Sequence, residues 1–158
     1  RRVVIPVQEL LDTAGKYFRK SMKNRTERIE LEIGTVDAKV IGDLNQLRFL
    51  LENLIDEALA VHEDGLLRLQ ARQDDEYIRF LFTDTRREKS MEELNLLFYP
   101  NLARMTAGEK GELRGTEYLV CKQIIRDHDE FAGRRGCRIN AEPAADGGFT
   151  VYFTVPRR

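Results

Sequence analysis

Residues 115–156 read GTEYLVCKQIIRDHDEFAGRRGCRINAEPAADGGFTVYFTVP, and this stretch decides the fold class. Its first part predicts a helix over residues 115–128, whose inward positions are Leu119, Val120, Ile124 and Ile125. Its second part predicts a hairpin that pairs residues 137–142 with residues 149–155 around a turn ending in two glycines. A helix followed by an antiparallel pair indicates a fold in which helices pack on a sheet.

Further helices are indicated by apolar residues at helical spacing. One amphipathic helix is expected from Pro6 to about Lys23, and a longer one follows Asp43, which is suited to cap it. Ser90 and Glu93 form a capping-box pattern in front of a short helix, which Pro100 ends. A loop is expected over residues 101–114.

Strands are indicated by apolar residues at every second position. They are expected at residues 28–33 and 38–41, and in a hairpin that begins at Gly65 and turns at Asp74-Asp75. Short hairpin connections favour antiparallel neighbours over a doubly wound parallel sheet. The sequence therefore predicts a two-layer α/β sandwich, with a mixed, mostly antiparallel sheet and helices on one face.

Composition excludes several classes of protein. The 158 residues suit a single domain over residues 1–158, and a net charge of -1 with interspersed acids and bases predicts no nucleic-acid partner. No apolar run approaches the roughly 20 residues that cross a bilayer, so we expect no direct membrane contact from this segment. Cys121 and Cys137 lack metal-like spacing, which predicts no metal site and a reducing, cytoplasmic setting. Because the chain starts at Arg1 and not at Met, we expect it to be a piece excised from a longer protein.

Four segments occur in the order found in one known superfamily. They are NLIDEALA at residues 53–60, DTRRE at 84–88, LFYP at 97–100 and GTEYL at 115–119. Together they resemble the ATP-binding domain of sensor histidine kinases, in the GHKL superfamily. The resemblance covers nearly the whole chain and implies a Bergerat-type ATPase fold.

The resemblance also implies which residues lie in the nucleotide site. Glu57 stands where the family has the asparagine that coordinates magnesium, and Asn53 is the retained asparagine one turn earlier. Asp84 matches the aspartate that accepts a hydrogen bond from the adenine amino group. Gly115 is the surviving member of the glycines that present backbone N–H groups to phosphate.

Several positions depart from the family pattern. Arg86 and Glu88 replace the two glycines after Asp84, Ala60 replaces the lysine that neutralises phosphate, and Glu117 adds a carboxylate near the phosphate end. We therefore expect a degenerate domain, a pseudokinase with poor or absent ATP binding, no assigned catalytic residue, no bound metal and no cofactor. Whether the domain is an enzyme stays open.

Each candidate residue also has a structural interpretation. Asp84 is either a polar residue that ends a strand or a relic of an adenine contact. Asn53 is interpreted as a buried residue whose side-chain amide is hydrogen-bonded within the protein. We interpret Glu57 as the partner of Arg86 or Arg87 in an ion pair that fills the former cleft.

Two functions follow from the resemblance. In the first, the domain serves signal relay or docking in a bacterial two-component sensor protein, with a response-regulator receiver or its own dimerisation and phosphoacceptor helices as partner. In the second, it is a functional kinase domain that binds ATP and Mg²⁺ and phosphorylates an upstream histidine. Either reading implies a cytoplasmic domain of a homodimeric parent that resides in the inner membrane.

Overall fold

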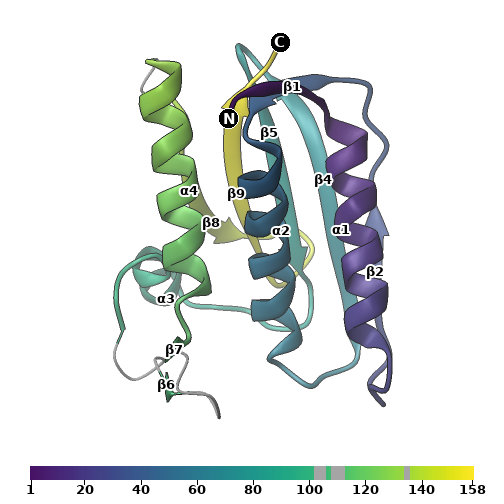
Figure 1. Cartoon of the computed structure of the whole chain (residues 1–158). Helices are drawn as coiled ribbons and strands as arrows, with labels where there is room; N and C mark the ends of the chain where they lie inside the picture. The colour runs from purple at the N-terminus through teal and green to yellow at the C-terminus, as the bar shows by residue number, and fades with distance from the viewer. Residues whose placement is uncertain (102–105, 108–112, 134–135) are drawn as a thin grey trace.

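The computed structural model describes residues 1–101, 106–107, 113–133 and 136–158 of the chain. One layer is a five-stranded sheet, and the other consists of three long helices that lie side by side on one face of that sheet (Figure 1). The predicted two-layer α/β sandwich is therefore confirmed. The helices are α1 (Val7–Met22), α2 (Leu44–Leu59), the short α3 (Met91–Leu96) and α4 (Glu117–Ala132). Within the described ranges, no helix combines the length and the apolar character that a bilayer crossing needs.

The five-stranded sheet has the order β2-β4-β5-β9-β8 and is mostly antiparallel, as predicted. Its strands are β2 (Ile29–Ile33), β4 (Gly65–Asp74), β5 (Tyr77–Asp84), β8 (Ile139–Pro143) and β9 (Phe149–Pro156). Only the β2 and β4 pair is parallel among these neighbours. The register places Phe80 of β5 opposite Phe153 of β9, and the two buried rings stack with their centroids 4.7 Å apart. This pair lies at the centre of the core.

Side-chain caps explain where two of the helices begin. The Asp43 carboxylate accepts a hydrogen bond of 2.9 Å from the backbone N–H of Gln46 and thereby caps α2. Ser90 and Glu93 form the capping box that the sequence predicts in front of α3. Both predicted helix starts are confirmed.

A strand that the sequence analysis missed opens the chain. β1 (Val3–Pro6) pairs antiparallel with β3 (Lys39–Gly42), the strand predicted at residues 38–41, in a separate two-stranded sheet. Ile5 is the one fully buried side chain of β1, so the segment lacks the alternating apolar signal of a longer strand. The pairing brings the start of the chain to the end of the molecule at which the C-terminus also lies (Figure 1).

The region around the predicted loop at 101–114 is described in part. β6 (Thr106–Ala107) pairs antiparallel with β7 (Leu113–Arg114), and residues 102–105 and 108–112 lie outside the described residues. α4 then runs beyond the predicted end at His128 as far as Ala132. It ends where Gly133 adopts the left-handed conformation with φ 64°, which a glycine reaches without strain.

His128 joins α4 to the start of α2. Its Nε2 accepts a hydrogen bond of 3.1 Å from the backbone N–H of Asp43, and its Nδ1 lies 2.8 Å from the carbonyl oxygen of Ile124. Because an amide N–H can only donate, Nε2 is unprotonated and Nδ1 carries the proton that the Ile124 oxygen accepts. Burial lowers the pKa of His128, so the folded chain favours this neutral form.

The neutral His128 makes stability depend on pH. Its pKa in the folded chain lies below the value of about 6.5 for an unfolded histidine, so the unfolded chain takes up a proton first as pH falls. The stability that neutral His128 contributes is complete above the unfolded pKa of about 6.5 and is lost as pH falls through the lower pKa of the folded chain. We expect His128→Gln to flatten the fall in the free energy of unfolding between about pH 7 and pH 5, measured by urea denaturation.

His62→Gln is the matched control for that prediction, because His62 is exposed. Its removal should leave the wild-type fall in place. Parallel pH profiles for the wild type and His128→Gln would contradict the role given to His128.

Candidate functional site

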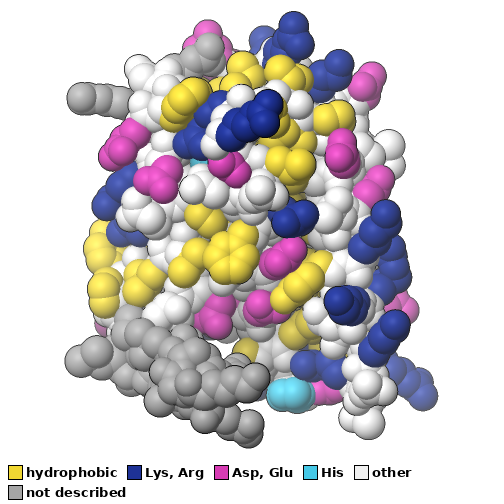
Figure 2. All heavy atoms as spheres, viewed as in Figure 1, with side chains coloured by type: hydrophobic (Ala, Val, Ile, Leu, Met, Phe, Trp, Pro, Cys, Tyr) yellow, Lys and Arg dark blue, Asp and Glu magenta, His cyan; other side chains and the backbone are white. Residues whose placement is uncertain are grey.

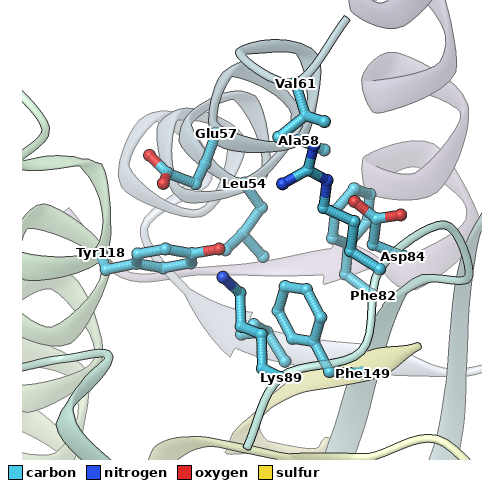
Figure 3. Close-up of a pocket in the computed structure, with 11 residues that line it drawn as sticks. Leu54, Glu57, Ala58, Val61, Phe82, Asp84, Lys89, Tyr118 and Phe149 are labelled. Atoms are coloured by element: carbon cyan, nitrogen blue, oxygen red, sulfur yellow. The ribbon is translucent and has the colours of Figure 1, made fainter. Parts of the chain in front are cut away.

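A narrow pocket lies between the C-terminal half of α2 and the adjacent end of the sheet (Figure 3). It is lined by Leu54, Glu57, Ala58, Val61, Phe82, Asp84, Arg87, Lys89, Tyr118, Phe149 and Val151. Its cavity volume is about 50 Å³. One water needs roughly 10–15 Å³ on this measure, so the lining side chains leave room for a few waters.

Asp84, at the end of β5, is the acidic residue of this pocket that matches the adenine contact. It is 6% exposed, and both of its carboxylate oxygens accept hydrogen bonds from Arg86. Oδ1 accepts from the Arg86 backbone N–H at 3.0 Å and from Nε at 2.9 Å, while Oδ2 accepts from an Nη at 2.9 Å. Of the roughly four acceptor positions of a carboxylate, three are thus used by one neighbour.

The Arg86 side chain is 2% exposed and turns toward the end of α2 instead of lining the pocket. Its two Nη atoms donate to the carbonyl oxygens of Ala58 at 2.6 Å, Val61 at 3.0 Å and Glu63 at 2.8 Å. With the two side-chain bonds to Asp84, all five guanidinium N–H groups have acceptors. The cost of burying the Arg86 charge is therefore offset by five hydrogen bonds and by the negative charge of Asp84.

The pairing of Arg86 and Arg87 corrects the interpretation of Glu57. Arg86 has no donor left for Glu57, and Arg87 forms its ion pair with Glu63. The reason is geometric: Arg86 lies two residues after Asp84 in an extended turn, so its Nε and Nη reach that carboxylate directly. The ion pair behind the cleft is therefore Arg86 with Asp84.

Two other cations follow Arg86 and line the pocket. Lys89 lies with its Nζ 5.2 Å from the centroid of the Phe149 ring, and Figure 3 shows it reaching between Phe149 and Tyr118. Arg87 is 57% exposed at its side chain. Arg87 and Lys89 alternate in the sequence with Arg86 and Glu88, the two residues that replace the family glycines.

Carboxylates dominate the opposite side of the site, where the family places phosphate. Burial raises the pKa of the Cys121 thiol, and the negative charges of Glu57 and Glu117 raise it further, so both carboxylates lie near one point of α4. A second hollow of about 240 Å³ adjoins this point. It is lined by Glu57, Lys89, Glu92, Glu93, Leu96, Leu97 and Asn101, three carboxylates against one lysine among the described residues.

Asn53 does not line either hollow. It is buried on α2, and its Nδ2 donates a hydrogen bond of 2.8 Å to the carbonyl oxygen of Phe49 one turn earlier. The interpretation of Asn53 as a buried amide bonded within the protein is confirmed.

Gly115 keeps the backbone conformation that a glycine allows, with φ 82°. The helix that follows it begins at Glu117, and Thr116 at its N-cap makes no side-chain capping bond. Glu117 has one carboxylate oxygen, Oε2, that is buried and has no hydrogen-bond partner among the described residues. A carboxylate therefore already lies at the helix N-terminus, where phosphate would bind.

No group of three His, Cys, Asp or Glu side chains in the described part of the chain is arranged to hold a metal ion. Carboxylates suit Mg²⁺, and Glu57 is the residue that could contribute one at the family position. Of the predicted site residues Glu57, Asp84, Asn53 and Gly115, the pocket brings together Glu57 and Asp84. Lys89 was not predicted as a lining residue, and the carbonyl oxygens around Arg86 could not be, because backbone acceptors leave no trace in residue type.

Gly148 lets the β8 to β9 turn pass directly against Asp84. With φ at 79°, a Cβ added here would lie 1.9 Å from the carbonyl oxygen of Asp84 and 2.7 Å from the Cα of Thr85. Gly147 also has a positive φ, 108°, but a Cβ there meets no described atom within 4 Å. Both positions favour glycine, while only Gly148 is confined by neighbouring backbone.

These two glycines give a matched pair of variants. We expect Gly148→Ala to lower the free energy of unfolding by roughly 2–4 kcal/mol more than Gly147→Ala, since backbone atoms must move in addition to the shared strain of positive φ. Urea denaturation of both variants measures the difference. Equal losses in the free energy of unfolding would mean that the close approach of Gly148 to Asp84 does not affect stability.

Comparisons with known proteins agree with this geometry. Residues 42–158 match the family model for histidine kinase-, DNA gyrase B- and HSP90-like ATPases. The signal transduction histidine-protein kinase BaeS of Escherichia coli K12 is 26% identical over 151 residues, which are 93% of this chain and 30% of BaeS. The chain thus spans less than a third of that relative.

Solved structures show the same fold. The catalytic domain of the histidine kinase ThkA matches with a TM-score of 0.75 at 19% identity, over 99% of this chain and 97% of that one. The mycobacterial sensor histidine kinase MprB matches with a TM-score of 0.73 at 20% identity, over 100% of this chain and 99% of that one.

Proposed function

The chain belongs to the family of histidine kinase-, DNA gyrase B- and HSP90-like ATPases, and we propose that it is a member that does not bind ATP. In this proposal it is a degenerate histidine kinase-like domain of a bacterial two-component sensor protein, used for signal relay or partner docking. The family membership sets the fold, and the residues of the cleft support the loss of the ligand.

The observation that carries the proposal is the bonding of Asp84 to Arg86. A ligand amino group that approached Asp84 would have to share a carboxylate that already accepts three hydrogen bonds from Arg86. The pocket beside it measures about 50 Å³, too small for a base unless lining side chains move. Freeing Asp84 would leave the buried guanidinium short of acceptors, which is costly.

The charge of the phosphate end supports the same conclusion. Glu57 stands at the magnesium position and Glu117 at the helix N-terminus, while Ala60 provides no positive charge. A triphosphate placed there would meet carboxylates in a partly desolvated site, where like charges repel strongly. Neither cofactor, ATP nor Mg²⁺, belongs to the proposed function.

Docking is the role that the remaining surface supports. Figure 2 shows acidic and basic side chains interspersed over the helical face, with apolar side chains along its middle. Exposed apolar residues on β1 and α2 are Val4, Leu44 and Phe49. The proposed partner is a response-regulator receiver, or the dimerisation and phosphoacceptor helices of a homodimeric parent with this domain in the cytoplasm. A solved complex of the histidine kinase ThkA with the response regulator TrrA supports the first choice.

The second candidate is a functional kinase domain that binds ATP and Mg²⁺ and phosphorylates an upstream histidine. Two observations favour it: Asp84 still lines the pocket, and Gly115 keeps its positive φ. This candidate requires Arg87 and Lys89 to leave the entrance.

Calorimetric titration with ATP and Mg²⁺ separates the two candidates. We expect no saturable heat for the wild type up to millimolar ATP, and no difference between the wild type and Asp84→Asn. The catalytic domain of ThkA, tested in parallel with the same nucleotide, shows whether the assay detects binding. A dissociation constant below about 1 mM for the wild type, lost in Asp84→Asn, would overturn the proposal.

A further inference from the structure

The guanidinium of Arg86 lies in a cage made almost entirely of backbone. Three carbonyl oxygens from the end of α2 and the segment after it, those of Ala58, Val61 and Glu63, face the two Nη atoms. The Asp84 carboxylate supplies the remaining acceptors and the counter-charge. We call these four groups the guanidinium cage.

Gly65 completes the cage from the other side. It has φ 146°, and a Cβ added to it would lie 2.5 Å from Cγ and 3.1 Å from Cδ of Arg86. The first residue of β4 is therefore a notch through which the Arg86 side chain passes. Two residues that are distant in the sequence are shaped for each other, which indicates a built feature and not a chance contact.

The bonds of the cage connect three elements. The carbonyl oxygen of Ala58 lies in the last turn of α2, and those of Val61 and Glu63 lie in the segment that follows the helix. Asp84 ends β5, and Gly65 begins β4. One side chain thus fastens the helix that carries Glu57 and Ala58 to the ends of two interior strands of the sheet, β4 and β5.

We propose that Arg86 is an internal clamp that fixes α2 against β4 and β5 without any ligand, and that its cage is a selective site for a planar guanidinium-type cation. This rests on the same Asp84–Arg86 bonding as the proposed function and adds the role of that bonding in holding α2 against β4 and β5. The selectivity follows from the acceptors: five are arranged around one flat fork, and an ammonium group has three donors in a different geometry.

Variants of Arg86 test the clamp, with Arg87→Ala as the matched control. Arg86→Ala should lower the thermal midpoint of the 158-residue chain by about 10 °C, since it leaves a buried carboxylate without its partner. Arg86→Lys should lower the thermal midpoint by nearly as much, because a lysine restores the positive charge but not the planar set of five guanidinium donors. Arg87→Ala removes a neighbouring, exposed arginine and should shift the midpoint by about 2 °C or less.

Chemical rescue tests the cage. Methylguanidinium, at concentrations far below denaturing ones, should raise the midpoint of Arg86→Ala in a saturable way and leave the wild type and Arg87→Ala unchanged. Methylammonium at the same concentration should not rescue. If the two cations change the thermal midpoint of Arg86→Ala equally, the variant has no site selective for a guanidinium, and the proposal is overturned.

The notch gives a test that does not depend on Arg86→Ala being stable alone. Gly65→Ala should cost more in the wild type than in the Arg86→Ala background, where the Cγ and Cδ atoms that the new Cβ would meet are absent. The strain of positive φ is common to both backgrounds. If Arg86→Ala folds only when methylguanidinium is present, the proposal is supported. Equal costs of Gly65→Ala in both backgrounds, or an Arg86→Lys as stable as the wild type, would overturn it.

No nucleotide enters these measurements, so their failure is distinct from failure of the proposed function. A chain that binds ATP and still shows selective rescue would retain the clamp. A chain that binds no ATP and shows no rescue would lose only the clamp.

Discussion

A guanidinium removed from water is stable only where each of its N–H groups finds an acceptor, and the cleft of this domain is arranged around that requirement. The N–H groups of Arg86 donate to the Asp84 carboxylate, to one carbonyl oxygen in the last turn of α2 and to two carbonyl oxygens in the segment after it. Breaking such a buried pair from one side costs roughly 3–5 kcal/mol. The C-terminal end of α2 is bonded through this one side chain to the ends of β4 and β5, while the apolar face of the helix packs in the core.

In the proposed function, the same requirement keeps a nucleotide base away from Asp84. An aspartate at the end of β5 can serve a ligand or a neighbouring arginine, and here the arginine holds both oxygens. In that proposal, a cleft that does not recognise the base has no need of a positively charged phosphate end. The carboxylates of Glu57 and Glu117, whose negative charges both raise the pKa of Cys121, are compatible with a site that admits no anion.

Most of the fold could be predicted from the sequence because its signals are local. Period-two strands, the Asp43 cap and the Ser90 capping box all depend on neighbours within a few residues. β1 was missed because a four-residue strand with one buried side chain carries almost no pattern. In the site, Glu57 and Asp84 were located by motif, but the partner of Arg86 was assigned wrongly, since the carbonyl oxygens of α2 and the notch at Gly65 appear only once the chain is folded.

The most direct measurement is the NMR spectrum of the arginine side chains, with Arg86 assigned by its loss in Arg86→Lys. A guanidinium bonded on every side cannot rotate about its C–N bonds, so we predict separate, slowly exchanging Nη proton signals for Arg86 in the absence of ligand. These signals should stay unchanged when ATP and Mg²⁺ are added at millimolar concentration. A single averaged Nη signal, or signals that shift or vanish on addition of ATP, would contradict the assignment of Asp84 to Arg86.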